Sequence, residues 1–315
     1  MRILCHSIVP LPVLTLVCAI GLSFGISSET RGQASQTDSL LQIKLENRIS
    51  DFAGDVGIYV EHLPSGMSAG VNADSLFPTA SMIKVPILLT IFDRIVNDTL
   101  SLSTPLTYRD SLYYEGADVL GSFKDGEEIT LDKLLLLMMS LSDNTASLWL
   151  QEISGSGTSI NEWLATSGFE GTRVNSRTPG RSSDWEKYGW GQTTPREMAT
   201  LLRMIRKGEA ISEWASEEMY RTLTRQYWND EALSAIPPYV QAAGKVGAVS
   251  RSKSEVVLVN GPSGDYVFCV ITNNQEDDRW EDDNAGYVLI RSISETLWQH
   301  FEPGSQWRPA KRSEP

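Results

Sequence analysis

The stretch FPTASMIKVPILL, residues 77–89, places a serine and a lysine three positions apart inside an apolar run. On a helix, positions i and i+3 share a face, so Ser81 and Lys84 are expected to point the same way. A serine hydroxyl needs a base to act as a nucleophile, and a lysine in apolar surroundings loses its proton readily enough to serve. The pattern alone is weak, because Ser250 and Lys253 match it too. A serine near a helix start and a lysine that reaches water explain it more simply.

Composition and charge describe an ordinary globular protein. The 315 residues are 41% hydrophobic and 21% charged, which is compatible with one large domain or two small ones. The net charge of −13, with no basic tract to offset it, argues against a nucleic-acid or anionic-membrane partner. The sequence therefore favours a small-molecule or peptide substrate and, as the simplest assembly, a monomer.

The first residues have the pattern of an export signal. Arg2 gives a positive start, VLTLVCAIGLSFG an apolar segment, and GQA at residues 32–34 a small-residue cleavage site. We expect a signal peptide over residues 1–34, cleavage near Ala34, and a periplasmic or secreted mature protein. An uncleaved anchor fits less well, because two prolines and a histidine interrupt the apolar run.

Cysteine and histidine usage gives little sign of metal chemistry. After cleavage only Cys269 remains, in the strand-like run YVFCVIT, where a cysteine is usually a small core residue. The three histidines are scattered and no His/Cys cluster has ligand spacing, so no metal and no cofactor is expected. The same scatter weakens a Ser-His-Asp triad, although sequence distance alone does not exclude one.

Expected strands lie near both ends of the chain, with helices between them. A helix is expected from residue 38 to 49, strands at 55–63, 67–74, 239–249, 255–262 and 265–274, and a last helix at 286–301. This order predicts an α/β (α+β) fold, with a mixed, mainly antiparallel sheet built from both termini and an inserted all-helical lobe. The predicted α/β lobe spans 35–79 and 210–306, the helical lobe 80–209, and a disordered tail 307–315.

Two local patterns fall inside the predicted helical lobe. Residues 168–192 show no periodicity, and a loop of that length is usually functional or mobile. In TTPREMATLLRMI, Thr194 fits a helix N-cap, Pro195 the first helical position and Glu197 the capping-box partner.

Two more motifs change the interpretation of the serine and lysine. SLSDNTA contains Ser142 and Asn144 directly after an expected buried helix, where a turn would expose both side chains. AAGKVGAVS places Lys245 and Gly247 on an expected strand. Each motif alone is common, since S-D-N occurs in many polar turns and K-x-G recurs at residues 124–126.

The three motifs in this order resemble the S-x-x-K, S-D-N and K-T-G set of class A β-lactamases and penicillin-binding proteins. The flanks PTASMIKVP, LLLLMMSLSDNTA and TTPREMATLL and the separations between motifs are similar as well. The resemblance covers essentially the whole mature chain. The sequence is identified as a divergent member of the class A β-lactamase-like serine hydrolase family.

The resemblance implies a role for each motif residue. Ser81 would attack an acyl carbonyl to give an acyl-enzyme, Lys84 would take or relay its proton, and Ser142 would pass a proton to the leaving nitrogen. The N–H of Ser81 and one from the strand near Ala248 or Val249 would form the oxyanion hole, where such a donor contributes roughly 10²–10³ in rate.

The remaining motif residues would bind the substrate. Asn144 would hold the substrate amide, and Gly247 would lie on the strand beside it. Lys245 would lower the local proton affinity and attract a substrate carboxylate.

The sequence departs from the family pattern at the K-T-G motif. Val246 replaces the threonine or serine, so a hydroxyl that would bind a substrate carboxylate is missing, a loss of roughly 1.5–3 kcal/mol. Arg251 and Lys253 are candidate replacements, or else solvated strand charges.

A second departure concerns deacylation. Class A enzymes carry a glutamate between S-D-N and K-T-G that activates water. In TRVNSRTPG, Arg173 and Pro179 align with that loop, and the glutamate position falls on Thr178. Asp184 and Glu186, later in the same loop, are candidate bases, or else ordinary loop charges. Without a base, acylation would outrun hydrolysis of the acyl-enzyme.

We therefore expect an exported serine hydrolase that opens β-lactam amides through an acyl-serine, with slow deacylation. A D,D-peptidase or transpeptidase acting on peptidoglycan stem peptides is the first alternative, which the missing glutamate favours somewhat. A non-catalytic cell-wall binding domain is the second alternative. The intact serine and lysine set argues against it, because a binding module needs no buried base.

Overall fold

The computed structural model of the protein describes residues 36–97, 99–116 and 118–310. The expected signal peptide, residues 1–34, lies outside these ranges and stands on the sequence alone. Within them, no helix combines the length and the apolar character needed to cross a bilayer. Of the expected tail, the structure describes residues 307–310, which form no helix or strand, and the Trp307 ring lies edge-on to Trp298.

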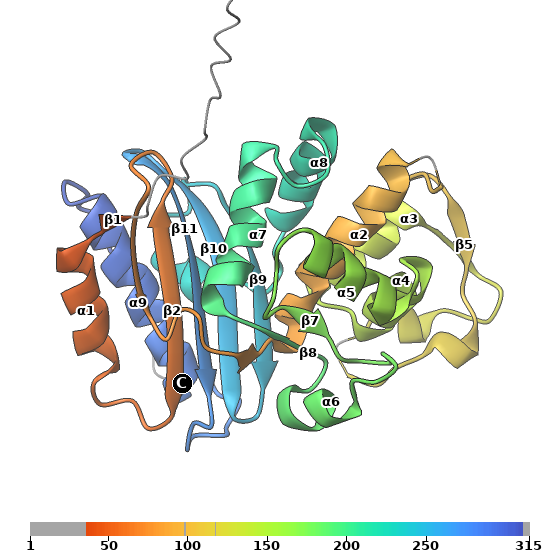
Figure 1. Ribbon diagram of the computed structural model, residues 1–315, viewed down its shortest axis with the longest axis horizontal. Coiled ribbons are helices and arrows are strands. Elements are labelled where there is room, and N and C mark those ends of the chain that lie inside the picture. Colours follow the sequence, from red (N-terminus) through yellow and green to blue (C-terminus); the bar gives the residue numbers. More distant parts are fainter. Residues whose placement is uncertain (1–35, 98, 117, 311–315) are drawn as a thin grey trace, which may run out of the picture. The chain divides into compact units, whose positions relative to one another are not determined.

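A six-stranded sheet has the strand order β1-β3-β2-β11-β10-β9 (Figure 1). Its strands are β1 (Gln36–Thr37), β2 (Asp55–His62), β3 (Met67–Val71), β9 (Ala242–Val249), β10 (Ser252–Gly261) and β11 (Gly264–Asn273). In this sheet β1 pairs with β3 in parallel, and the other neighbours are antiparallel. Because β2 pairs with β11, the sheet joins strands from both parts of the sequence, and the predicted fold class is confirmed.

The apolar core is divided between the two faces of the sheet, as alternation along a strand requires. On β11, Phe268 and Val270 join the cluster that includes buried residues of α1 (Ser39–Ile49) and α9 (Ala285–Phe301). Their neighbours Cys269 and Ile271 join the cluster on the other face. Cys269 is fully buried there, so the prediction that it is a small core residue is confirmed.

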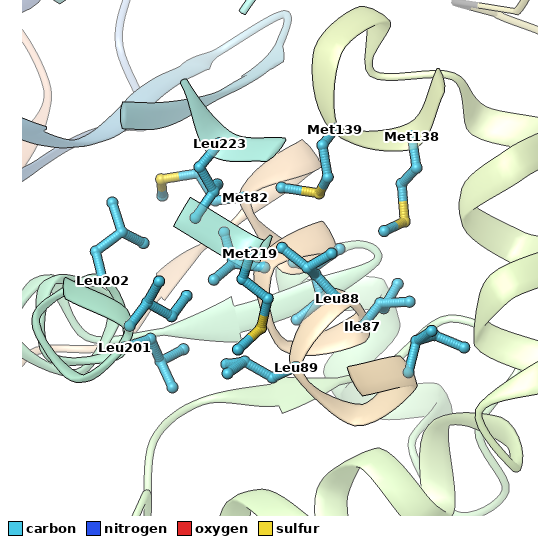
Figure 2. Packing of buried hydrophobic residues seen from close by; sticks show 14 of the residues in the cluster. Met82, Ile87, Leu88, Leu89, Met138, Met139, Leu201, Leu202, Met219 and Leu223 are labelled. Atoms are coloured by element: carbon cyan, nitrogen blue, oxygen red, sulfur yellow. The ribbon is translucent and has the colours of Figure 1, made fainter. Parts of the chain in front are cut away.

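The helical segment contains α2 (Lys84–Val96), α3 (Leu131–Leu136), α4 (Asn144–Ile153), α5 (Ser156–Thr166) and α6 (Ser182–Tyr188). A two-stranded hairpin of β5 (Pro105–Thr107) and β6 (Glu128–Thr130) precedes α3. Helix α2 is buried along most of its length because other elements pack around it. Figure 2 shows Met138 and Met139, from the turn after α3, and Met219 and Leu223 of α8 (Glu213–Leu223) gathered about it.

Helix α7 (Pro195–Lys207) lies on the sheet although its sequence falls within the predicted helical lobe (Figure 1). The reason is an apolar stripe along the helix, which packs into the core cluster that also contains residues of β10 and β11. The stripe consists of Met198, Leu201, Leu202 and Ile205. The boundary placed at residue 209 therefore separates α7 from the sheet that it covers.

The start of α7 is only partly as predicted. Thr194 accepts a hydrogen bond from the backbone N–H of Glu197 at 3.1 Å, and Pro195 begins the helix. The Glu197 carboxylate does not close a capping box. It accepts the N–H groups of residues 170–172 instead, because the preceding loop brings three unpaired donors to it.

Residues 168–192 contain more regular structure than their sequence indicates. β7 (Arg173–Val174) and β8 (Gly191–Thr193) flank α6, and β8 also pairs with β4 (Phe77–Pro78). Strands of two or three residues give no readable periodicity, which is why the sequence predicts a single irregular loop. This small sheet ties the loop to the segment directly before Ser81.

Candidate active site

Ser81 lies on a tight turn at the start of α2. A 3₁₀ turn, Ala80–Ile83, leads into the helix, and Ala80 has a φ of 42°, a left-handed value that is uncommon for a residue with a side chain. Met82 and Ile83 are fully buried, so packing holds this turn while Ser81 stays partly exposed. As predicted, Ser81 and Lys84 point the same way, with 3.0 Å between Ser81 Oγ and Lys84 Nζ.

Lys84 Nζ is fully buried within hydrogen-bond distance of four oxygens. Besides Ser81 Oγ, they are the Ser142 carbonyl at 2.6 Å, Ser142 Oγ at 3.0 Å and Asn144 Oδ1 at 3.0 Å. Burial and then the charge of Lys245 lower the pKa of Lys84 well below its ordinary value, and Asp143 opposes this shift. In a neutral amine, two N–H groups serve the two oxygens that only accept, which leaves the lone pair for a serine hydroxyl.

The S-D-N turn brings three of these oxygens into place, two of them from Ser142. Ser142 follows the π-helical turn Leu137–Leu141 and has a φ of 60° and a ψ of 30°. This left-handed conformation lets its carbonyl and its hydroxyl face Lys84 Nζ together. A substitution that disfavours the left-handed region would separate the two groups.

Asp143 has a structural part in the same turn that the sequence pattern does not indicate. Its buried carboxylate accepts backbone N–H groups of Val119, Leu120 and Ala146, which caps α4 and ties the segment before β6 to the turn. Gly116 of that segment lies so close to Asn144 that a Cβ on it would come 2.6 Å from the amide nitrogen. The turn is thus held from two sides.

Lys245 completes the buried hydrogen-bond network. Its Nζ lies 3.0 Å from Ser142 Oγ and 3.0 Å from the Val246 carbonyl oxygen. Burial lowers the pKa of Lys245 to about 7, against the opposing effect of Glu255. Lys245 has no exposed surface, and its attraction for a substrate carboxylate, the second role implied for it, stays a prediction.

Gly247 allows β9, an end strand of the sheet, to approach the nucleophile. A Cβ on this residue would lie 2.5 Å from the Thr79 carbonyl oxygen and 3.1 Å from the Ser81 nitrogen. A side chain does not fit in that space. The close approach places the backbone at Ala248, the next residue of β9, beside the turn of Ser81.

The loop candidates for deacylation make no hydrogen bond to Ser81 or Lys84 in the described structure. Thr178 donates to a backbone carbonyl at 2.9 Å, and its Oγ1 would be 1.8 Å from a Cβ on Gly157, so it faces α5. Asp184 forms an ion pair with Arg181 at 3.2 Å. Glu186 is exposed on α6.

An aromatic pair that the sequence does not indicate lies between this loop and Lys84. The Trp190 ring centroid is 5.8 Å from Lys84 Nζ, and Tyr114 contacts Trp190 edge-on, with 5.2 Å between ring centroids. Both rings line a cavity of about 650 Å³ together with Leu148, Trp185 and residues of the loop at 175–180. The only local signal for Trp190 is its place between two glycines, which marks a turn.

Neither candidate replacement for the missing hydroxyl at Val246 faces the site. Arg251 donates to two backbone carbonyl oxygens of the segment after β11. Lys253 is fully buried, donates to two carbonyl oxygens of the β9–β10 turn, and lies 4.0 Å from the Trp280 ring centroid. It is therefore neither a site cation nor a solvated strand charge. Among the described residues, no group of three His, Cys, Asp or Glu side chains is arranged to hold a metal.

Comparisons with known proteins agree with this geometry. Residues 40–301 match the model of the beta-lactamase enzyme family. The chain is 21% identical to beta-lactamase VEB-1 of Pseudomonas aeruginosa, covering 85% of this chain and 92% of that protein. It is 24% identical to a beta-lactamase of Rhodobacter capsulatus, covering 88% of each.

Solved structures show the same likeness. PBP-A is 27% identical with a TM-score of 0.76, covering 85% of this chain and 98% of that one, and a PBP-A mutant has been solved as an acyl-enzyme complex with penicillin G. A beta-lactamase of Sphaerobacter thermophilus has 24% identity and a TM-score of 0.74 over 84% of this chain and 97% of that one. The resemblance seen in the motifs is confirmed: the chain belongs to the beta-lactamase enzyme family, as a divergent class A β-lactamase-like hydrolase.

Proposed function

We propose that the protein opens β-lactam amides through an acyl-serine intermediate on Ser81 and releases the acyl group slowly. The observation that carries the proposal is the buried network around Lys84 Nζ, which lies 3.0 Å from Ser81 Oγ. A base at that distance is within reach of the serine proton. Export of the mature chain after cleavage near Ala34 belongs to the same proposal and is supported by the sequence alone.

Acylation follows from the contacts of two lysines and two serines. Neutral Lys84 accepts the Ser81 proton as Oγ bonds to the acyl carbon, and the N–H groups of Ser81 and Ala248 stabilise the oxyanion. Ser142 Oγ, 3.0 Å from both Lys84 Nζ and Lys245 Nζ, donates its proton to the leaving nitrogen and regains one from Lys84. Low pKa values at both lysines favour such proton relay near neutral pH.

Slow release of the acyl group follows from the loop at residues 173–192, on the other side of Ser81 from Lys245. Hydrolysis of an acyl-serine needs a base that activates water, and general bases contribute roughly 10²–10⁴ in rate. Thr178 faces α5, Asp184 is paired with Arg181, and the ring that lies over Lys84 belongs to Trp190, which has no basic group. The acyl-enzyme is therefore expected to accumulate.

A D,D-peptidase-like or transpeptidase-like activity on peptidoglycan stem peptides is the second candidate function. Two observations favour it: the loop presents no base near Ser81, and the chain resembles PBP-A at 27% identity. Both functions share the same acylation chemistry. They differ in which acceptor, water or an amine, resolves the acyl-serine.

The test is intact-protein mass spectrometry of the mature chain mixed with a penicillin and sampled over minutes. A stable adduct that disappears in Ser81→Ala is the expected result, and Thr194→Ser serves as a matched change of a hydroxyl residue outside the site. Catalytic consumption of the penicillin without an adduct would contradict slow release. Neither adduct nor consumption would overturn the assignment to β-lactams.

A further inference from the structure

The side of the site that receives the leaving group can be identified from the proposed proton donor. Ser142 donates the proton, so the leaving group departs past Ser142 and the strand segment at Lys245 and Val246. In β-lactams, and in peptides cleaved at their last peptide bond, the leaving group carries a carboxylate. A site that binds such a substrate well needs a hydroxyl or an exposed cation there.

The sheet offers no cation to this side. The β10 residues opposite Lys245, Gly247 and Val249 are Val256, Ser254 and Ser252. Directly opposed residues on neighbouring strands point to the same face, so these β10 side chains share the Lys245 face. Ser254 is accordingly buried with its hydroxyl donating to the Gly247 carbonyl oxygen at 3.0 Å. Val246 points to the other face, where the residue opposite it is the buried acid Glu255.

The nearby cations are committed elsewhere. Lys253, opposite Ala248, shares the Val246 face, but its ammonium donates to two backbone carbonyl oxygens and lies over the Trp280 ring. Arg251 is likewise held by backbone carbonyls. Arg225 lines a separate hollow with Asp132 and Glu218. Lys245 is itself fully buried. Among the described residues, no lysine or arginine contacts the Ser142 and Val246 side with an exposed charged group.

Aromatic side chains border this side instead. The Trp228 indole N–H donates to the carbonyl oxygen of Leu141, the residue before Ser142, at 2.9 Å, and the Tyr227 backbone N–H donates to the Ser140 carbonyl at 3.2 Å. The two rings contact each other edge-on at 5.1 Å and are 62% and 44% exposed for Tyr227 and Trp228. Exposed aromatic rings fixed beside the S-D-N turn are suited to apolar or uncharged groups.

We propose that the preferred substrates of this site are esters, thioesters or amides whose leaving group is uncharged. This inference rests on the acyl-serine chemistry proposed above and deepens it by naming the substrate class. The Oγ–C bond to Ser81 forms as the C–O, C–S or C–N bond to the leaving group breaks. The leaving group takes the Ser142 proton, and water later yields the free acid and restores Ser81.

The experiment compares two thioesters that carry the same acyl group, S-hippuryl-thioglycolate and S-hippuryl-thioglycolamide. Their leaving groups differ only in that the first bears a carboxylate and the second a carboxamide. Thiol release and Ser81 acylation are measured for the mature protein at low salt and at 0.5 M salt, after correction for the hydroxide reactivity of each ester. High salt screens the long-range repulsion that a chain of charge −13 exerts on any anion, so a preference that persists belongs to the site.

We expect kcat/KM for the amide to exceed that for the carboxylate about tenfold or more at both salt concentrations. Val246→Thr should narrow this ratio by about tenfold, because it restores a hydroxyl donor, whereas Val246→Ala should not. Equal rates, a preference for the carboxylate, or a preference that vanishes in high salt would each overturn the inference. Acylation by penicillin but by neither thioester would also overturn it and leave the acyl-serine proposal intact. Acylation by none of the three would instead refute the acyl-serine proposal.

Discussion

The two flanks of Ser81 are built differently. On one flank, Lys84, Ser142 and Lys245 form a buried hydrogen-bond network in which each nitrogen and hydroxyl has a partner at 3.0 Å or less. On the other flank, the loop over residues 173–192 presents the Trp190 ring to Lys84 and borders an open cavity. The first flank has the groups that the proposed acylation requires, whereas among the described residues the second has no acid hydrogen-bonded to Ser81 or Lys84. This difference is the basis for proposing fast acylation and slow hydrolysis.

The largest effect is expected from the acylating flank. Lys84→Met keeps an apolar chain of similar length but removes the base, so acylation by a penicillin should fall by about 10³. The matched control is Lys253→Met, because Lys253 is also fully buried and lies in the second S-x-x-K pattern. Acylation in that variant should change less than tenfold. Similar losses in both variants, measured by mass spectrometry over time, would contradict the assignment of the base.

A carboxylate placed on the second flank should accelerate release. In Trp190→Glu we expect preformed acyl-enzyme to decay at least tenfold faster than in Trp190→Gln, because only the glutamate can activate water. Thr178→Glu, the change that the family pattern suggests, should leave decay unchanged because this side chain faces Gly157. Faster decay in Thr178→Glu alone would show that the loop rearranges and that the comparison of flanks is wrong.

The buried charges behind the first flank predict a dependence of stability on pH. Burial raises the pKa of Glu255 to about 8, so the folded chain keeps a proton that the unfolded chain releases above about pH 4.5. That contribution to stability is fully present below pH 4.5 and is lost as the pH rises through 8. Lys245, with its pKa lowered to about 7, contributes in the opposite direction between pH 7 and its ordinary value.

Glu255→Gln removes the first of these two effects, and with it the Glu255 charge that raises the pKa of Lys245. The amide mimics the protonated acid and can still accept the Ala232 N–H, so the variant should gain stability relative to wild type as the pH rises from 5 to 9. Urea midpoints at several pH values measure this difference. A difference that does not change with pH would mean that the carboxyl is ionised throughout.

The smallest effects are expected from the two loop acids. Asp184→Asn and Glu186→Gln should each leave the decay of the acyl-enzyme within about twofold, since neither acid is hydrogen-bonded to Ser81 or Lys84 in the described structure. Trp190→Glu serves as the positive control for the same assay. A tenfold slower decay in either variant would identify the missing base and remove the contrast between the flanks.

Much of the fold and of the first flank could be predicted from the sequence because both depend on local patterns. Alternating residues predict β2, a continuous apolar run predicts β11, and the i, i+3 spacing predicts that Ser81 and Lys84 share a face. The burial of Lys245 and its contact with Ser142 bring together residues far apart in sequence. That juxtaposition was implied only through the resemblance to a family.

The second flank could not be predicted because its contacts have no periodic signal. Trp190 and Tyr114 meet across a gap of many residues, and each looks like an ordinary loop aromatic in the sequence. Glu197 fits a capping box by spacing, yet its carboxylate serves the N–H groups of residues 170–172. A local sequence pattern does not show which distant backbone groups will bind a side chain in the folded protein.

The most direct test of unequal flanks is a stopped-flow record of a chromogenic cephalosporin mixed with the mature protein. We predict a burst of about one chromophore per Ser81, followed by a steady phase whose rate is at least tenfold lower than that of the burst. Both phases should be absent in Ser81→Ala. A fast, linear record without a burst would show that deacylation keeps pace with acylation. It would mean that the loop side of the site holds a working base after all.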